Sequence, residues 1–318
     1  MNKYIVSLMI IISASALLFA DQSNEKVKKY EDKLTIKVSA ERPTLNFKVS
    51  YDDEELKFLP NTLVNASISA SYAGFTLSFG NELSGSEKDS ETYGKTEFMD
   101  YRLRYYKRKW GADLFFSQYK GFYLDNPTDY GNVKGDAFHK RGDLKLSFYG
   151  ANGYYIFSDS YSFSSSFNFD EKQIKSGGSF LAMISVNQLN VDADRTLIPT
   201  AVNSRFDSGR GYKGGQYTIL GLLPGAAYTL VINRFFITGV LFFGGGAVYK
   251  VQKTNDGDKT STVPFGKTNA RISVGYNDDL LFGGFMVHGD LTGFSSQKET
   301  DVKADYIQLN LYFGVRLF

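Results

Sequence analysis

The chain contains no cysteine, and its 318 residues include only 6 prolines, 2 histidines and a single tryptophan. The lack of cysteine excludes disulfides, thiolate metal sites, cysteine nucleophiles and a lipid-modified N-terminal cysteine. The formal net charge is only +2, so the chain lacks the basic field that drives nucleic-acid binding, and no nucleic-acid partner is expected. After residue 20 there is no long apolar run. This excludes a bundle of membrane-spanning helices but not a membrane barrel, whose strands are only half apolar.

Phenylalanine (27), tyrosine (22) and glycine (31) are abundant, a composition that favours a β-rich protein. The clearest pattern lies at 304–318, where every second residue from Ile307 to Leu317 is apolar and the residues between them are polar or small. Successive side chains of a strand face opposite sides, so this strand has one apolar face. A last strand that pairs back with the first one closes a barrel. The chain ends on an aromatic, as outer-membrane barrels commonly do, although Phe318 falls on the polar side.

Similar alternation recurs along the chain and predicts an all-β fold, a transmembrane antiparallel β-barrel of about 12 strands (10–14). Short turns on one side and long polar loops on the other join these strands, as in outer-membrane barrels. Residues 161–169, in which aromatics alternate with serines, are predicted to form one of the strands. The alternation of short and long connections slips between Ser158 and Gly215, which indicates that one segment there is misassigned or that one loop hides a strand.

The N-terminal residues 1–20 carry a basic residue, Lys3, near their start and continue as an apolar stretch, which predicts a secretory signal peptide. The charged segment 21–33 has no apolar face and is expected to be a solvated periplasmic lead-in. The barrel is predicted over 34–318. The pattern leaves open whether 34–55 is its first hairpin or an extra N-terminal hairpin. The predicted location is therefore the outer membrane of a two-membrane bacterium.

Five stretches of the chain, in their order, resemble an uncharacterised bacterial family, a domain of unknown function. They are 30–35 (YEDKLT), 59–61 (LPN), 119–124 (YKGFYL), 154–157 (YYIF) and 175–180 (KSGGSF). The resemblance covers most of the chain after residue 20 and implies an outer-membrane or cell-envelope β-barrel. It implies no activity and no catalytic residues.

Charged residues on the polar face of the strands are the candidates for lining the lumen. They are Asp100, Arg102, Arg104, Asp113, Lys145, Arg271 and Arg316. One interpretation is a narrow, slightly basic channel that attracts small anions. The other is a structural network in which arginines pair with aspartates and fill a small lumen. Both interpretations stay open at the level of the sequence.

Aromatic residues near strand ends or on apolar faces are candidates for a girdle at the membrane interface. They are Tyr72, Tyr101, Tyr105, Trp110, Tyr161 and Tyr276. Ordinary core aromatics would give the same pattern. The expected partners are outer-membrane lipid around the barrel and the barrel-assembly machinery, which would recognise strand 304–318.

Catalytic, cofactor and metal sites are not predicted. His288 lies on a strand without a hydrolase motif, so a histidine facing the lumen or the interface is favoured over the base of a lipid hydrolase. His139 is expected in a loop. The sequence Asn255-Asp256-Gly257-Asp258 resembles part of a calcium loop but lacks the full spacing.

The predicted function is a passive narrow pore or a structural envelope protein. Two alternatives remain, a lipid-acting enzyme of the acyl hydrolase type and a secreted soluble β-protein. The soluble protein is disfavoured because the polar faces are rich in serine and asparagine, which suit an interior, rather than in the charges of an exposed surface.

Overall fold

The computed structural model describes residues 26–61, 64–83, 88–126, 140–206, 211–255, 257–294 and 301–318. The predicted signal peptide at 1–20, His139 and Asp256 of the calcium-like loop lie outside the described residues. Among the residues described, no helix is long and apolar enough to cross a membrane.

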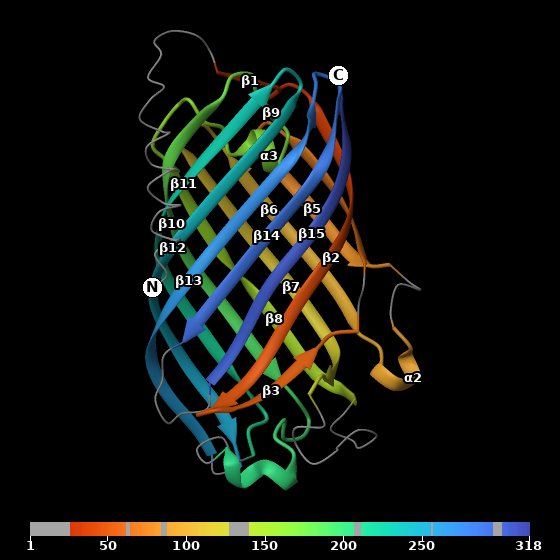
Figure 1. Ribbon diagram of the computed structural model, residues 1–318, viewed down its shortest axis with the longest axis vertical. Helices are drawn as coiled ribbons and strands as arrows, with labels where there is room; N and C mark the ends of the chain where they lie inside the picture. Colours follow the sequence, from red (N-terminus) through yellow and green to blue (C-terminus); the bar gives the residue numbers. More distant parts are fainter. Residues whose placement is uncertain are drawn as a thin grey trace.

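Twelve antiparallel strands form a closed ring (Figure 1). In ring order they are β2 (Leu34–Tyr51), β4 (Asn65–Tyr72), β5 (Phe75–Glu82), β6 (Glu97–Tyr106), β7 (Trp110–Leu124), β8 (Lys140–Ile156), β10 (Gly177–Asp192), β11 (Gly214–Ile232), β12 (Phe235–Thr254), β13 (Gly257–Asn277), β14 (Leu281–Phe294) and β15 (Asp301–Leu317). The ring closes where β15 pairs with β2, from Leu317 opposite Leu34 to Asp301 opposite Ser50. The predicted barrel, its strand number and its closure by the last strand are confirmed.

Smaller elements lie at the two ends of the barrel. They are β1 (Val27–Lys29), β3 (Glu54–Leu59), α2 (Ser90–Tyr93), α3 (Ser164–Phe167), β9 (Glu171–Gln173) and η2 (Thr200–Arg205). The segment 34–55 therefore contains a full barrel strand, β2, followed by the start of β3. This short strand pairs with β2 and with the end of β7.

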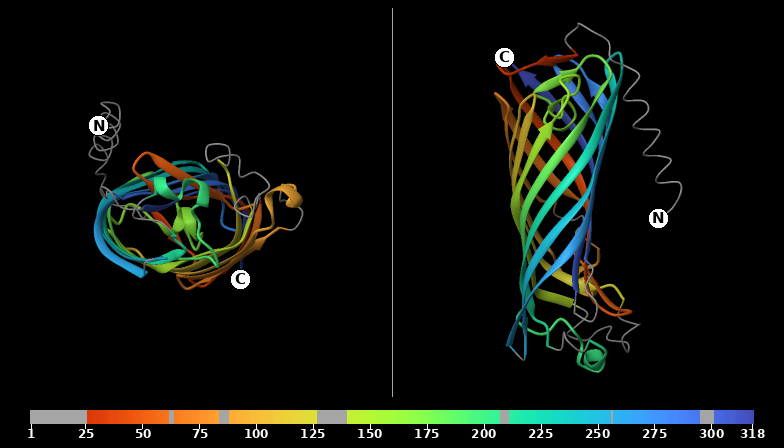
Figure 2. Two further views of the ribbon diagram at one scale, coloured as in Figure 1. Left: turned by 90° about the horizontal axis from the view of Figure 1, so that it is seen from below. Right: turned by 90° about the vertical axis from the view of Figure 1, so that its left-hand side faces the viewer.

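The two ends differ in their connections (Figures 1 and 2). The turn end, at the top of Figure 1, has the short links 73–74, 107–109, 233–234 and 278–280 together with the chain's C-terminus. Ala73 and Gly74 both have positive φ, as a two-residue type I′ hairpin turn requires. The loop end, at the bottom, carries β3, α2 and η2 on longer connections. Short periplasmic turns and longer external loops are typical of outer-membrane barrels.

The polarity of the barrel wall inverts partway along the strands. On β2, Val38 in the turn-end half is 50% exposed on the outer face, whereas Phe47 and Val49 in the loop-end half are buried inside. On β10, Ile184 is 60% exposed outside and Val191 is buried inside. The turn-end half thus has an apolar outer belt, as a membrane barrel needs, and its lumen wall is polar except where side chains such as Leu181 and Val240 pack around residues 161–167. The loop-end half has the reverse arrangement of a water-soluble barrel.

The segment 161–169 is not a strand, and this prediction is wrong. Residues 157–176 connect β8 to β10 and fold into the turn end of the lumen, where they carry α3 and β9 (Figure 1). We call residues 157–176 the plug. The aromatics and serines of residues 161–169 are buried together, because both kinds of side chain lie inside the barrel wall. The misassigned plug accounts for the slip in the predicted alternation of connections.

The charged segment 21–33 also differs from the predicted solvated lead-in, as far as it is described. β1 pairs with β9 of the plug, from Val27 opposite Gln173 to Lys29 opposite Glu171. Tyr30 is buried, and its hydroxyl donates a hydrogen bond to Asp279 Oδ1 at 2.6 Å. The start of the described chain therefore lies across the turn end and holds the plug.

Candidate functional site

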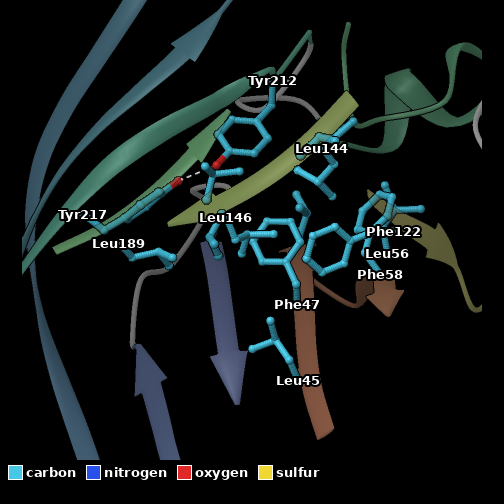
Figure 3. Close-up of a cluster of buried hydrophobic side chains, with 14 of the residues drawn as sticks. Leu45, Phe47, Leu56, Phe58, Phe122, Leu144, Leu146, Leu189, Tyr212 and Tyr217 are labelled. Atoms are coloured by element: carbon cyan, nitrogen blue, oxygen red, sulfur yellow. Dashed lines mark hydrogen bonds between the residues drawn. The ribbon is translucent and has the colours of Figure 1, made fainter. Parts of the chain in front are cut away.

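The lumen at the loop end is filled by a cluster of buried apolar side chains that point toward one another (Figure 3). Phe47, Phe58 and Leu144 are 1% exposed or less, and the rings of Phe47 and Phe58 lie 5.9 Å apart. The loop after β10 contributes Ile198 and Phe206, both fully buried, to the same cluster. Burial of this kind stabilises by roughly 1.5–3 kcal/mol per side chain. We call this cluster the loop-end core.

The plug fills the lumen at the turn end. Lys37 Nζ on β2 donates to the carbonyl oxygen of Phe167 at 3.2 Å, and Asn277 Nδ2 donates to that of Ser165 at 3.2 Å. The Phe169 ring stacks on Phe282 with their centroids 4.4 Å apart. Phe169 has a φ of +70°, a left-handed conformation that costs a residue with a Cβ about 1–2 kcal/mol. The packing of its ring offsets this strain.

Arg316, near the end of β15, joins the plug to the barrel wall. Its guanidinium donates to the Phe169 carbonyl at 2.8 Å, to Asn277 Oδ1 at 2.7 Å and to the Asp278 carbonyl. It also lies over the Tyr30 ring, 4.2 Å from the centroid. Arg316 is 1% exposed. Its contacts hold the plug against the barrel wall, so it does not line an open channel.

Two neighbouring carboxyl groups of the plug have raised pKa values. Burial, together with the nearby Glu171, raises the pKa of Asp170 to about 7. Burial also raises the pKa of Glu171, whose carboxylate accepts a hydrogen bond from Ser162 Oγ at 2.5 Å. Both groups disfavour their charged forms, so the plug is expected to respond to pH.

A polar chamber lies in the lumen between the loop-end core and the plug. It holds a cavity of about 120 Å³ and a second cavity of about 70 Å³. Five residues line both cavities: Arg102, Arg104, Asp113, Arg271 and His288. Asp100 lines the second cavity. The second cavity extends to Phe167 of the plug. Five of the seven predicted lumen residues thus come together in one place.

The charges of the chamber form two main networks. Arg102 binds both oxygens of Asp100, at 2.7 and 3.2 Å. Tyr154 donates to Asp113 Oδ2 at 2.8 Å and accepts a hydrogen bond from Arg271 Nη2 at 2.9 Å. The guanidinium of Arg271 also faces the plug, 5.3 Å from the centroid of the Phe163 ring. These networks agree with the structural interpretation of the lumen charges.

His288 faces the chamber from β14. Its Nε2 lies 3.0 Å from Asn269 Nδ2, which also donates to Asp290 Oδ2 at 3.0 Å. Lys267 pairs with the same carboxylate at 2.9 Å. No serine hydroxyl among the described residues is hydrogen-bonded to His288. Its place in the lumen also separates it from lipid, which a lipid-acting enzyme would have to reach.

Lys145 does not line the lumen, and this prediction is wrong. It stands opposite Lys120 on β7 and Asp192 on β10, both of which are exposed on the outer face. Its neighbour Leu146 points inward and is buried in the loop-end core. The prediction assumed that the polar residues of this strand face the lumen, as in a membrane barrel. This part of β8 lies in the loop-end half, where the polar residues face outward instead.

The predicted girdle aromatics fall into two groups. Tyr72, Tyr101 and Trp110 are exposed on the outer face, and Tyr105 and Tyr276 lie half-buried on the same face. Tyr161, in contrast, is 1% exposed and packs inside the lumen, with its ring centroid 6.4 Å from that of Phe163. Because it belongs to the plug, Tyr161 cannot contact lipid.

Several residues of the chamber were not predicted. Glu41 accepts hydrogen bonds from Ser67 Oγ at 2.6 Å and Asn310 Nδ2 at 3.1 Å, and Lys37 and Lys267 also line the cavities. Lys37 and Glu41 could have been predicted from the alternation along β2. Both stand at odd positions, whereas the outward-facing Ile36 and Val38 stand at even ones. Within the described ranges, no group of three or more histidine, aspartate or glutamate side chains could hold a metal ion.

A family model described as Domain of unknown function (DUF4421) matches residues 26–317. No curated protein matches the chain. Among solved structures, the outer membrane protease OmpT from Escherichia coli has a TM-score of 0.36 and 8% identity over 92% of this chain and 98% of that chain. The Pseudomonas putida toluene transporter TodX has a TM-score of 0.28 and 11% identity over 90% and 89%. OmpT of Vibrio cholerae has a TM-score of 0.30 and 10% identity over 92% and 99%. Identities of this size say nothing about a shared activity.

Proposed function

We propose that this chain, which belongs to the family described as Domain of unknown function (DUF4421), is a structural protein of the bacterial outer membrane with a closed lumen. The observation that carries the proposal is the filling of both ends of the lumen. The loop-end core closes one end with side chains as tightly buried as those of a soluble domain, and the plug closes the other. An open general pore needs a continuous water path, which this packing interrupts.

The length of the strands supports a part that projects from the membrane. A tilted strand needs about 9–11 residues to cross the hydrocarbon layer, whereas β12 has 20 residues and β13 has 21. The apolar belt covers only the turn-end half. The proposal is that the turn end faces the periplasm and that the loop-end half stands above the outer leaflet as a rigid extension.

Conductance in a planar bilayer tests the closed lumen. We expect the refolded, heat-modifiable protein to insert and to remain electrically silent in potassium chloride. A variant in which a short glycine-serine linker replaces residues 161–173 should also stay silent, because the loop-end core remains in place. Steady stepwise openings of the unaltered protein would refute the closed lumen.

A gated channel is the second candidate, and the charged chamber favours it. Ionisable groups at membrane depth are costly and often mark a solute pathway, and a structural barrel could be filled with serine and asparagine alone. In that case the linker variant would conduct with a preference for anions. The same recording therefore separates the two candidates. No catalytic role is part of either proposal.

A further inference from the structure

The larger cavity of the chamber has two chemically different sides. One part of its wall is formed by apolar side chains that include Phe115, Leu189 and Ile219. The other part is lined by charged and polar groups, among which Arg104 and Arg271 lie toward the turn end. This division follows from the inversion of polarity along the strands, because the cavity lies where the apolar interior of one half meets the polar interior of the other.

The charges around the two cavities do not balance. Of the described residues that line them, five are cationic (Lys37, Arg102, Arg104, Lys267 and Arg271) and four are carboxylates (Glu41, Asp100, Asp113 and Asp290). Arg102, Lys267 and Arg271 each have a carboxylate within 4 Å, and Lys37 binds a plug carbonyl.

Among the described residues, Arg104 is the cation of the chamber that has neither a carboxylate within 4 Å nor a backbone carbonyl as its partner. Within the described part of the chain its guanidinium makes one hydrogen bond, from Nη1 to Ser78 Oγ at 3.2 Å. Arg104 lines both cavities, so its remaining donors are available to a group that enters the chamber. A planar guanidinium with free donors matches the two oxygens of a carboxylate.

The size of the space limits what can enter. The larger cavity, at about 120 Å³, is comparable with the apolar cavity of ~150 Å³ that takes up benzene in an engineered protein. It therefore has room for a body about as large as one aromatic ring. The adjoining cavity of about 70 Å³ leaves space for a small polar group beside Arg104. A long acyl chain does not fit.

We propose that the chamber binds a small amphipathic carboxylate, with its apolar body against Phe115, Leu189 and Ile219 and its carboxylate on Arg104. This inference goes beyond the closed structural barrel, because a closed barrel can still hold a small molecule. The carboxylate neutralises the unpaired arginine, and the apolar body fills space that is too apolar to hold ordered water well. The plug residue Phe167 lines the adjoining cavity.

Isothermal titration of the refolded full chain in nanodiscs, with benzoate as the probe, tests this proposal. We expect saturable binding of one benzoate, and at least tenfold weaker binding of benzylamine, which has the opposite charge, and of acetate, which lacks the ring. Arg104→Met should weaken benzoate binding at least tenfold. The matched control is Arg108→Met. Arg108 pairs with Asp159 outside the lumen at 2.8 Å, and its loss should leave benzoate binding unchanged.

A second variant tests the apolar side if Arg104→Met does not fold. Leu189→Phe adds volume to the apolar wall and should weaken benzoate more than acetate. Dodecanoate distinguishes a free small acid from a lipid-derived one, and it should not displace benzoate. The proposal is overturned if benzoate does not bind saturably, if benzylamine binds equally well, if folded Arg104→Met binds benzoate normally, or if dodecanoate competes.

Discussion

Replacing Phe169 with alanine should release the plug while the barrel stays folded. The Phe169 ring is fully buried, stacks on Phe282 and lies 4.9 Å from the ring centroid of Tyr312. Truncation of a buried phenylalanine to alanine costs roughly 3–5 kcal/mol. The left-handed backbone strain remains in the variant, since alanine also has a Cβ. We therefore expect the docking of the plug to weaken by about 3–5 kcal/mol.

Hydrogen exchange of the amides of residues 161–173 measures this loss. At 1.36 kcal/mol for each factor of ten, their protection should fall by more than about 100-fold. The matched control is Phe243→Ala. The Phe243 side chain is 58% exposed on the outer face of β12, and its loss should leave the plug amides as protected as before. Both variants should keep the barrel's resistance to unfolding in cold detergent. Equal protection in Phe169→Ala and Phe243→Ala would show that the aromatic stack does not hold the plug.

Two further predictions concern the plug and the inverted half of the wall. The pKa of Asp170 is raised from 3.8 to about 7 in the folded plug. The contribution of this carboxyl group to the stability of the plug is therefore complete below pH 4 and is lost as the pH rises through 7. This loss is on the order of 4 kcal/mol at most. The plug amides should thus exchange more slowly at pH 5 than at pH 8 after correction for intrinsic rates, and Asp170→Asn should reduce that difference. Leu146→Lys should lower the free energy of unfolding, measured by urea titration, by several kcal/mol, because it buries an unpaired charge. Lys145→Leu should change the same free energy by less than about 1 kcal/mol. The opposite order would contradict the assigned orientation of β8.

The barrel itself could be predicted because its signals are local. The alternation from Ile307 to Leu317 requires only that successive side chains of a strand face opposite sides, and a terminal strand with an apolar outer face needs a partner at both edges. Pairing with β2 supplies the second partner. The family resemblance was confirmed over residues 26–317. None of these inferences depends on knowing which distant residues meet inside the lumen.

The plug could not be predicted in the same way. Its aromatics and serines alternate as they would on a strand, but Ser164–Phe167 form a short helix. Tertiary contacts decide the outcome, because Ser166 Oγ is hydrogen-bonded to Thr238 Oγ1 at 2.6 Å and Phe169 packs against three strands. The chamber is equally nonlocal. Arg271 and Tyr154, which are far apart in sequence, share a hydrogen bond, and an unaligned sequence carries no record of that pairing.

The inversion of polarity was nevertheless present in the sequence as a change of parity. On β2 the apolar residues fall on even positions through Val38 and on odd positions from Leu45. On β10 the outward-facing apolar residues end at Val186, and beyond it only the inward-facing Leu189 and Val191 are apolar. A one-residue shift of apolar parity inside an unbroken strand moves the apolar side to the other face. In a membrane barrel such a shift marks the level at which the outer surroundings change from lipid to water. The chamber lies at that level, so the same parity change that sets the depth of the barrel in the proposed membrane arrangement also creates a cavity with apolar and charged parts of its wall.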